Sequence, residues 1–312
     1  RRMSEDTPAS DIRIGIIGGT GLGEALGAEK GEHRKVNTPF GQPSSPIVLT
    51  QWQGVDIAIL QRHGHGHIYN PSTVPYRANI FALKSLGVTH IIASGATGSL
   101  REEIEPGHVV IADQVIDKTH KRDHTFYEHA AVHVEFAEPF CPVMRNWLID
   151  TRKRAETDHR MTQLDMVHVH EKGTYVCMEG PAFSTRAESH MHRAWGGDLI
   201  GMTCMPEAKL AREAEIAYAL IALPTDYDCW RPHPPGVDVQ TLLAEIMGNL
   251  KRATENCVTL IKAALEDVAT LRDRRSPAHD ALTLAVWSDK KTIDPTQIER
   301  LKVLWGRHFA GR

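Results

Sequence analysis

Two carboxylates stand two residues apart at the end of a long apolar segment. Asp226 and Asp228 follow residues 215–223 (EIAYALIAL), whose composition predicts a buried strand. Side chains at positions i and i+2 of an extended chain point the same way, so the two acids are placed to converge on one ligand. Neighbouring carboxyl groups raise each other's pKa, and one of them can keep a proton near neutral pH. Such a pair is suited to accept a hydrogen bond from an amine and to donate one to a ring nitrogen. The alternative is a pair of surface loop acids without a ligand.

A glycine-rich turn, residues 18–23 (GGTGLG), follows the apolar residues 12–17 and predicts an anion-binding loop. Backbone N–H groups can approach an anion closely where glycines remove side chains, and Thr20 adds a hydroxyl. The glycines do not fit the GxGxxG spacing of dinucleotide-binding proteins, and no Gly-Lys-Ser/Thr follows as in a Walker loop. The remaining interpretations are a generic anion-binding turn and a tight turn without a ligand.

Two more predicted strands end in groups that suit an anion. The second strand leads into Arg62 and His63, and the forked donors of a guanidinium match phosphate. The third predicted strand, residues 88–93, leads into a predicted turn of small residues, 94–99, which contains Ala96. Open parallel sheets bind ligands at the carboxyl ends of their strands, so we expect these turns to lie around one site.

Histidines alternate with glycines in residues 63–67 (HGHGH). Three imidazoles at alternate positions are compatible with a metal ion. The two glycines make the segment irregular, however, and no carboxylate stands beside it. A structural role for His65 and His67 is therefore the preferred interpretation.

The composition narrows the class of protein. The 312 residues carry a net charge of −3 and are 41% hydrophobic, which is typical of one large α/β domain or two smaller domains. There is no basic excess for nucleic acid, no apolar segment of membrane-spanning length, and no apolar signal core in residues 1–10, so we expect a cytoplasmic protein. Five scattered cysteines without a CxxC pair argue against a structural zinc site and fit reduced thiols.

Strand-like and helix-like segments alternate over about 270 residues, which predicts an α/β fold. Residues 237–270 have the spacing of a long amphipathic helix, and residues 118–135 are typical of a long functional loop. Residues 1–11 are expected to be disordered or extended. Residues 272–277 predict a linker to a C-terminal extension, residues 271–312, whose role the sequence does not indicate.

Taken together, the motifs resemble the purine nucleoside phosphorylase superfamily, and most closely its methylthioadenosine phosphorylase family. Eight pieces carry the resemblance, in family order between about residues 12 and 270. They are Gly18-Gly19-Thr20-Gly21-Leu22, Thr38-Pro39-Phe40-Gly41, Arg62-His63-Gly64, residues 98–103 (GSLREE), residues 137–140 (AEPF), Glu179-Gly180-Pro181 with Phe183, Met202-Thr203 with Pro206-Glu207, and residues 225–230 (TDYDCW).

The resemblance implies one phosphorylase domain over residues 12–270, with a central mixed sheet flanked by helices. It implies a pentosyltransferase that carries out reversible phosphorolysis, in which phosphate attacks the sugar as the purine leaves. Methylthioadenosine would give adenine and methylthioribose 1-phosphate in purine and methionine salvage. Inorganic phosphate is then a co-substrate, and no metal or other cofactor is expected. The family also implies a homotrimer with its sites at subunit interfaces, and no nucleic-acid or membrane partner.

The resemblance also assigns roles to individual residues. Thr20, Arg62, His63, Ala96 and Thr203 would hold phosphate. The expected nucleoside contacts are Met202 against the ribose, Phe183 against the purine face, and Asp226 and Asp228, the expected catalytic pair, at N7 and the exocyclic amine. An apolar pocket of Val237, Val239, Leu242 and Leu243 would hold the methylthio group, and His133 would reach the site of a neighbouring subunit.

The acid pair also indicates the substrate class. A carboxylate accepts a hydrogen bond from the amine of adenine but faces lone pairs at the carbonyl of a 6-oxopurine, where selective relatives usually carry Asn. Keeping Asp at both positions therefore favours an aminopurine. The alternatives are a 6-oxopurine nucleoside or methylthioinosine phosphorylase, a catalytically idle nucleoside- or phosphate-binding protein, and a metal hydrolase built on residues 63–67. Two departures from the family pattern are Gly95, where close relatives often have Thr, and the histidines after His63.

Overall fold

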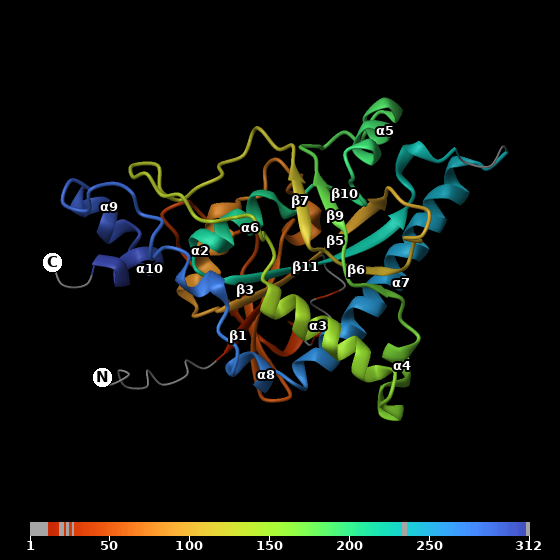
Figure 1. Ribbon diagram of the computed structural model, residues 1–312, viewed down its shortest axis with the longest axis horizontal. Coiled ribbons are helices and arrows are strands. Elements are labelled where there is room, and N and C mark those ends of the chain that lie inside the picture. Colours follow the sequence, from red (N-terminus) through yellow and green to blue (C-terminus); the bar gives the residue numbers. More distant parts are fainter. Residues whose placement is uncertain (1–11, 19–21, 23–24, 27, 233–235, 310–312) are drawn as a thin grey trace.

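One mixed sheet of eleven strands lies at the centre of the protein (Figure 1). The computed structural model describes all residues except 1–11, 19–21, 23–24, 27, 233–235 and 310–312. The strands are β1 (Arg13–Gly18), β2 (Glu32–Arg34), β3 (Ile47–Trp52), β4 (Val55–Gln61), β5 (His90–Ser99), β6 (Val109–Ile111), β7 (Gln114–Asp117), β8 (Val169–His170), β9 (Thr174–Cys177), β10 (Leu199–Gly201) and β11 (Ala217–Asp226).

Helices cover both faces of this sheet, so the predicted α/β architecture with a flanked mixed sheet is confirmed (Figure 1). The α-helices are α2 (Tyr76–Ser85), α3 (Pro142–Ala155), α4 (Thr162–Asp165), α5 (Arg186–Ala194), α6 (Cys204–Glu213), α7 (Val239–Leu265), α8 (Ala269–Arg272), α9 (Pro295–Arg300) and α10 (Lys302–Trp305). The 3₁₀ helices are η1 (Ala28–Lys30), η2 (His65–His67), η3 (His159–Met161), η4 (Asp228–Trp230), η5 (Pro277–Asp280) and η6 (Gly306–Phe309).

Strand β5 organises the sheet. It pairs in parallel with β1 on one side and with β11 on the other, and β4 extends the parallel set beyond β1. Near its end, β5 also pairs antiparallel with β10, through Ser99 with Leu199. The apolar strands β1, β4, β5 and β11 are buried on both faces, as parallel strands usually are. Their carboxyl ends therefore meet at one edge of the sheet.

The predicted turn at residues 94–99 is wrong, because β5 continues through Ser99. Strand β11 supplies the reason, since it also continues past its apolar segment and pairs with β5 as far as Gly98. Small residues permit this close pairing. A Cβ added to Gly98 would lie 3.1 Å from the Cβ of Asp228 and 3.1 Å from Ile200 Cγ2. Pairing between distant segments thus outweighs the local turn tendency of glycine and serine.

Two hydrophobic layers hold the sheet. On one face α2 and α6 pack with the C-terminal segment, and this layer includes Phe126 and Trp305. On the other face α3 packs with α7 and α8, in a layer that includes Trp147 and Ile261. Figure 1 shows α2 and α6 on the opposite side of the sheet from α3 and α8. No helix in the described part of the chain is long and apolar enough to cross a membrane.

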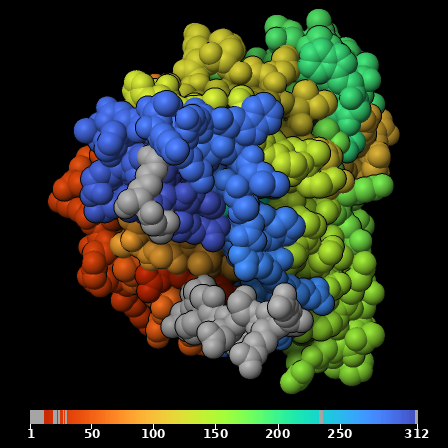
Figure 2. All heavy atoms as spheres, turned by 60° about the vertical axis from the view of Figure 1, so that its left-hand side comes forward, coloured from red at the N-terminus to blue at the C-terminus, as the bar shows by residue number. Residues whose placement is uncertain are grey.

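The C-terminal segment, residues 277–309, packs onto the same core as the rest of the chain. Leu282 and Trp305 are fully buried in the layer with α2 and α6. The buried carboxylate of Glu215 accepts hydrogen bonds from the backbone N–H of Leu282 at 3.1 Å and from Arg307 Nε at 2.8 Å. The predicted linker at residues 272–277 is wrong at its end, because Ser276 is buried against Cys141. Figure 2 shows this segment, in blue, spread over one face of the molecule.

His90, at the start of β5, gives stability a predictable dependence on pH. Its ring is buried beside His279, with a centroid separation of 4.9 Å, and burial followed by the charge of His279 lowers its pKa to about 3. The unfolded chain takes up a proton at this ring below about pH 6.5, whereas the folded chain does not until about pH 3. Stability from this group is therefore present above about pH 6.5 and is lost as the pH falls.

We expect His90→Gln to flatten the loss of unfolding free energy on acidification. Because the His90 ring stays neutral in the folded state, the free energy of unfolding of the wild-type chain falls by up to about 2 kcal/mol between pH 6.5 and pH 5. Urea unfolding at these two pH values measures the difference, with His159→Gln at an exposed position as the control. Equal slopes for the wild-type chain and His90→Gln would contradict the assignment.

Candidate active site

Arg62 is the most deeply buried charge at the edge where the parallel strands end. It follows β4, is 1% exposed, and donates from Nε and Nη2 to the two carboxylate oxygens of Glu207, both at 2.8 Å. Its Nη1 donates to the carbonyl of Ser94 at 2.8 Å, and the hydroxyl of Tyr218 donates to Glu207 at 2.8 Å. Burial alone would lower the pKa of Arg62, but the charge and hydrogen bonds of Glu207 raise it further. A guanidinium has five N–H donors, so two remain for a ligand.

Thr203 and β5 approach this guanidinium from the other side. A Cβ added to Gly95 would lie 3.4 Å from Thr203 Oγ1 and 3.7 Å from Arg62 Nη1. The next residue, Ala96, is exposed. The structure therefore brings together Arg62 and Thr203 of the expected phosphate set at Gly95, and Ala96 follows Gly95 on β5. Thr20 lies outside the described residues.

His63 lies next to Arg62 as a neutral ring. Its Nδ1 lies 2.8 Å from the carbonyl oxygen of Tyr69, which only accepts, so Nδ1 carries the proton and Nε2 presents a lone pair. Burial, and then the charge of Arg62, lowers its pKa to about 4. The ring stacks on His67 with centroids 4.1 Å apart. At neutral pH His63 therefore offers a hydrogen-bond acceptor rather than a donor.

The histidine run does not gather metal ligands. Within the described residues, His63, His65 and His67 do not form a group of three whose ligand atoms converge. Segment 65–67 is an exposed 3₁₀ turn, and Gly66 takes a φ of +71° inside it. The structural interpretation of His65 and His67 therefore remains preferred over the metal hydrolase alternative.

Gly95→Thr tests the departure from the family pattern. The β-carbon has ordinary contact distances to Thr203 and Arg62, so we expect threonine to be accommodated with its hydroxyl beside the guanidinium. One additional hydrogen bond contributes about 0.5–1.5 kcal/mol, and we expect the KM for phosphate to fall by roughly 2–10-fold. Gly95→Ala is the matched control and should leave that KM unchanged. A raised KM in the Thr variant would show that the hydroxyl does not face the ligand.

Asp226 and Asp228 lie together at the end of β11, next to Gly98 of the neighbouring strand β5. A Cβ added to Gly98 would lie 3.3 Å from Asp226 Oδ1 and 3.1 Å from Asp228 Cβ. The predicted proximity is therefore present, but its geometric reason was wrong. The strand ends at Asp226, and Asp228 begins η4 with a φ of +51°, so a tight turn brings the acids together.

The two carboxyl groups have different surroundings. Asp226 accepts from the backbone N–H of Asp228 at 2.8 Å and from the Thr225 hydroxyl at 2.8 Å. Asp228 accepts a hydrogen bond from the hydroxyl of Ser189 on α5. Burial raises the pKa of Asp228. Hydrogen bonds from Ser189 and from the backbone N–H of Cys229 oppose this effect in part, and the charge of Asp226 adds a smaller increase. The expected direction holds for one member of the pair, with burial as the main cause.

The expected sugar and purine contacts lie on neighbouring loops. Met202 is half-buried, and its sulfur would come within 2.5 Å of a Cβ at Gly180, where the φ of +69° also requires glycine. Phe183 precedes α5 and is 85% exposed, so its ring has an open face. Helix α5 begins at Arg186, and Thr185 and Glu188 form a capping box at its start.

The residues of the expected methylthio pocket are largely open to solvent in the single chain. Val237, Val239 and Leu243 are exposed on the first turns of α7 and just before it, and Leu242 is half-buried. Figure 1 shows this end of α7 extending beyond the sheet. His133 lies on another loop, where its backbone N–H donates to the carbonyl of Ala285 at 2.9 Å. These predicted contacts are therefore placed on the surface of the single chain.

Two buried partners in the site had no role in the sequence-based prediction. Glu207 was noticed only as part of a motif, and Ser189 gave no local signal. A charged residue in the otherwise apolar start of α6 is the one sequence feature that marks Glu207, because a buried carboxylate requires a cation. Ser189 is recognisable only once α5 packs against η4.

Residues 13–266 match the sequence model of the phosphorylase superfamily. The chain belongs to this superfamily. The S-methyl-5'-thioadenosine phosphorylase of Geobacter sulfurreducens is 45% identical over 297 residues, which cover 95% of this chain and 98% of the relative. A match of this length must include much of residues 271–312, the predicted extension. Because it belongs to this superfamily, the chain is a pentosyltransferase of the purine nucleoside phosphorylase type.

Two solved phosphorylase structures are similar to the whole chain. A methylthioadenosine phosphorylase from an antarctic soil metagenomic library has a TM-score of 0.83 and 44% identity, covering 95% of this chain and 99% of that one. A variant of adenosine/methylthioadenosine phosphorylase from Schistosoma mansoni, in complex with methylthioadenosine, has a TM-score of 0.74 and 36% identity. The match covers 89% of this chain and 100% of the Schistosoma mansoni chain.

Proposed function

We propose that this protein catalyses the reversible phosphorolysis of methylthioadenosine to adenine and methylthioribose 1-phosphate. One observation carries the proposal. Gly95 faces Arg62 and Thr203, Gly98 faces Asp226 and Asp228, and both glycines lie on β5. Three residues of extended strand span about 10 Å, so the Arg62 group and the acid pair lie near the same end of β5. The relatives named above support the choice of substrate.

The proposed mechanism assigns each group a charge to stabilise. As the glycosidic bond breaks, positive charge develops on the ribose and negative charge on the purine. Phosphate held by Arg62 and Thr203 lies against the sugar, where its negative charge stabilises the positive charge on the ribose. A protonated carboxyl of the acid pair donates to N7 and stabilises the negative charge on the purine as general acid. The other carboxyl accepts from the exocyclic amine, and the proton belongs to the pair rather than to one residue.

The proposed chemistry needs inorganic phosphate as co-substrate and no metal or redox cofactor. His63 fits it as a neutral acceptor, because a monoprotonated phosphate or a ribose hydroxyl can donate to its Nε2. The five cysteines are all free, which fits the reducing environment of a cytoplasm.

The proposal includes a homotrimer. Phe183, Val239 and Leu243 are large apolar side chains that one chain leaves exposed, and exposed patches of this kind mark interaction sites. His133 and Trp287 form another exposed pair, with ring centroids 4.7 Å apart. In the trimer, His133 of one subunit would close the nucleoside site of the next. Sedimentation of the full-length chain would contradict this if it remained a monomer at assay concentration.

Competing substrates provide the test. Purine release is measured from methylthioadenosine, inosine and guanosine at equal concentration and saturating phosphate. We expect adenine release with inosine and guanosine idle. Fast turnover of inosine would keep the fold and phosphate site but replace the substrate with a 6-oxopurine nucleoside. Undetectable phosphorolysis with retained adenine binding would favour the idle binding protein.

A further inference from the structure

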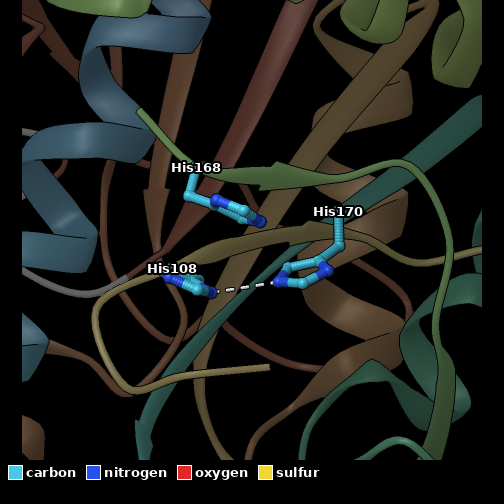
Figure 3. Close-up of side chains that lie close together, drawn as sticks. All are labelled: His108, His168 and His170. Atoms are coloured by element: carbon cyan, nitrogen blue, oxygen red, sulfur yellow. Dashed lines mark hydrogen bonds between the residues drawn. The ribbon is translucent and has the colours of Figure 1, made fainter. Parts of the chain in front are cut away.

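Three histidines converge at the far side of the sheet from β1 (Figure 3). His108 directly precedes β6, and His168 and His170 lie just before and on β8, which pairs with β6. Among the described residues this is the one group of three histidines, cysteines or acids whose ligand atoms approach one another, all within 4.8 Å. Figure 3 shows ring nitrogens of His108 and His168 turned toward His170.

The rings are held close before any ion binds. His108 Nδ1 lies 3.0 Å from His170 Nε2, which requires a proton between the two nitrogens. The backbone N–H of Glu105 also donates to His108 Nδ1, at 3.1 Å, so that proton resides on His170. The His168 ring stacks on His108 with centroids 4.1 Å apart. Two rings at β8 and one ring at the start of β6 are therefore already close together.

The spacing is close to that of a metal site. Zn–N bonds of about 2.05 Å in a tetrahedral site separate the ligand nitrogens by about 3.3 Å. The pair at 3.0 Å must open slightly, and His168, whose side chain is exposed, must move inward by about an ångström. The ion replaces the Nε2 proton of His170, which moves to Nδ1 of the same neutral ring. Binding also gives up the hydrogen bond from Glu105, so we expect moderate affinity.

The chemistry of the group selects the kind of ion. Neutral imidazoles suit zinc, copper and nickel rather than the hard cations calcium and magnesium. The hydrogen bonds from Glu105 and His170 require a lone pair on His108 Nδ1, so this nitrogen is already free of a proton. Glu105 adds negative charge with Oε2 at 3.9 Å from His108 Nε2, and the charge of Arg252 opposes it.

We propose that His108, His168 and His170 bind one zinc ion, or a similar divalent transition-metal ion, per chain. The ion has a structural role, because it fastens β8 to β6. Strand β8 consists of two residues and joins the sheet through Val109 with Val169 and Val110 with His170. Strand β6 pairs in turn with β11, the strand that ends at the acid pair. The site is separate from the proposed phosphorolysis, and its test does not depend on activity.

The experiment uses the full-length chain after chelation and dialysis. Calorimetric titration with Zn²⁺ is expected to give one site per chain with a Kd in the micromolar range. At a hundredfold excess over Kd we expect Tm to rise by about 5 °C. Co²⁺ provides a second readout, because nitrogen ligands in a four-coordinate site give it visible absorption bands. The absence of saturable Zn²⁺ binding to the wild-type chain would overturn the proposal.

Variants assign the ion to these rings. His168→Ala with His170→Ala is expected to weaken Zn²⁺ binding at least tenfold and, at the same Zn²⁺ concentration, to reduce the rise in Tm by about half or more. If the double variant does not fold, His168→Ala alone removes an exposed ring and should weaken binding in the same way. His159→Ala with His190→Ala controls for exposed histidines, and His65→Ala with His67→Ala controls for the other histidine run. Undiminished binding in the His168 variants, or loss of the site in either control, would overturn the proposal.

Discussion

Replacing Asp226 by Asn should lower kcat/KM for methylthioadenosine by about 10²–10⁴-fold, the range that general acid–base groups contribute. The substitution removes one of the two carboxyl groups that share a proton, and it places an amide N–H where the amine of adenine needs an acceptor. The same amide can donate to a 6-carbonyl, so turnover of inosine relative to methylthioadenosine should rise. Steady-state rates on both substrates at saturating phosphate measure the change in selectivity.

The control for Asp226→Asn is Asp150→Asn, which alters an exposed acid on α3. It should keep wild-type rates on both substrates. Asp228→Asn should also reduce turnover of methylthioadenosine, because Asp228 is the member of the pair whose pKa burial raises. If Asp226→Asn keeps the wild-type preference for methylthioadenosine over inosine, the acid pair does not contact the base.

Removing either member of the Arg62–Glu207 pair should destabilise the protein by roughly 3–5 kcal/mol. Both side chains are almost completely buried, so Arg62→Met leaves an unpaired carboxylate and Glu207→Leu leaves an unpaired guanidinium. Urea unfolding of the two single variants measures the loss. Arg62→Met should in addition raise the KM for phosphate at least tenfold, because the two free N–H groups are lost.

The double variant Arg62→Met with Glu207→Leu separates folding from phosphate binding. Apolar side chains of similar volume leave no buried charge, and much of the lost stability should return. The raised KM for phosphate should remain. Single variants as stable as the wild type would contradict the structural part of this account, and a double variant with normal phosphate dependence would remove Arg62 from the phosphate site.

Strand ends were the part of the structure that local patterns predicted well. The apolar segments before Arg62 and Asp226 are buried parallel strands, because such segments satisfy their backbone groups only within a sheet. Their order in the sheet places both residues at one edge. The prediction of one shared site therefore rested on a general property of open parallel sheets rather than on any single residue.

Contacts between distant segments were beyond local patterns. Residues 94–99 have the composition of a turn, yet pairing with β11 makes them strand. Ser276 has the surroundings of a linker residue, yet it is buried against Cys141. The carboxylate that holds Arg62 lies on α6, 145 positions along the chain, and no spacing rule connects the two.

The predicted methylthio pocket and the predicted role of His133 remain predictions, because most of these side chains are exposed in the single chain. Val239 is 80% exposed, and the backbone N–H of His133 donates to the carbonyl of Ala285 in the C-terminal segment. Their proposed roles require a neighbouring subunit.

The most direct test follows phosphorus during the reaction. Methylthioadenosine and inorganic phosphate are mixed with the full-length chain, and ³¹P NMR is recorded while adenine is measured by absorbance. The account predicts that methylthioribose 1-phosphate forms in a one-to-one ratio with adenine, and that omitting phosphate stops adenine release. Adenine released at an undiminished rate without phosphate would show a hydrolase instead, and it would contradict the assignment of Arg62 and Thr203 to a phosphate co-substrate.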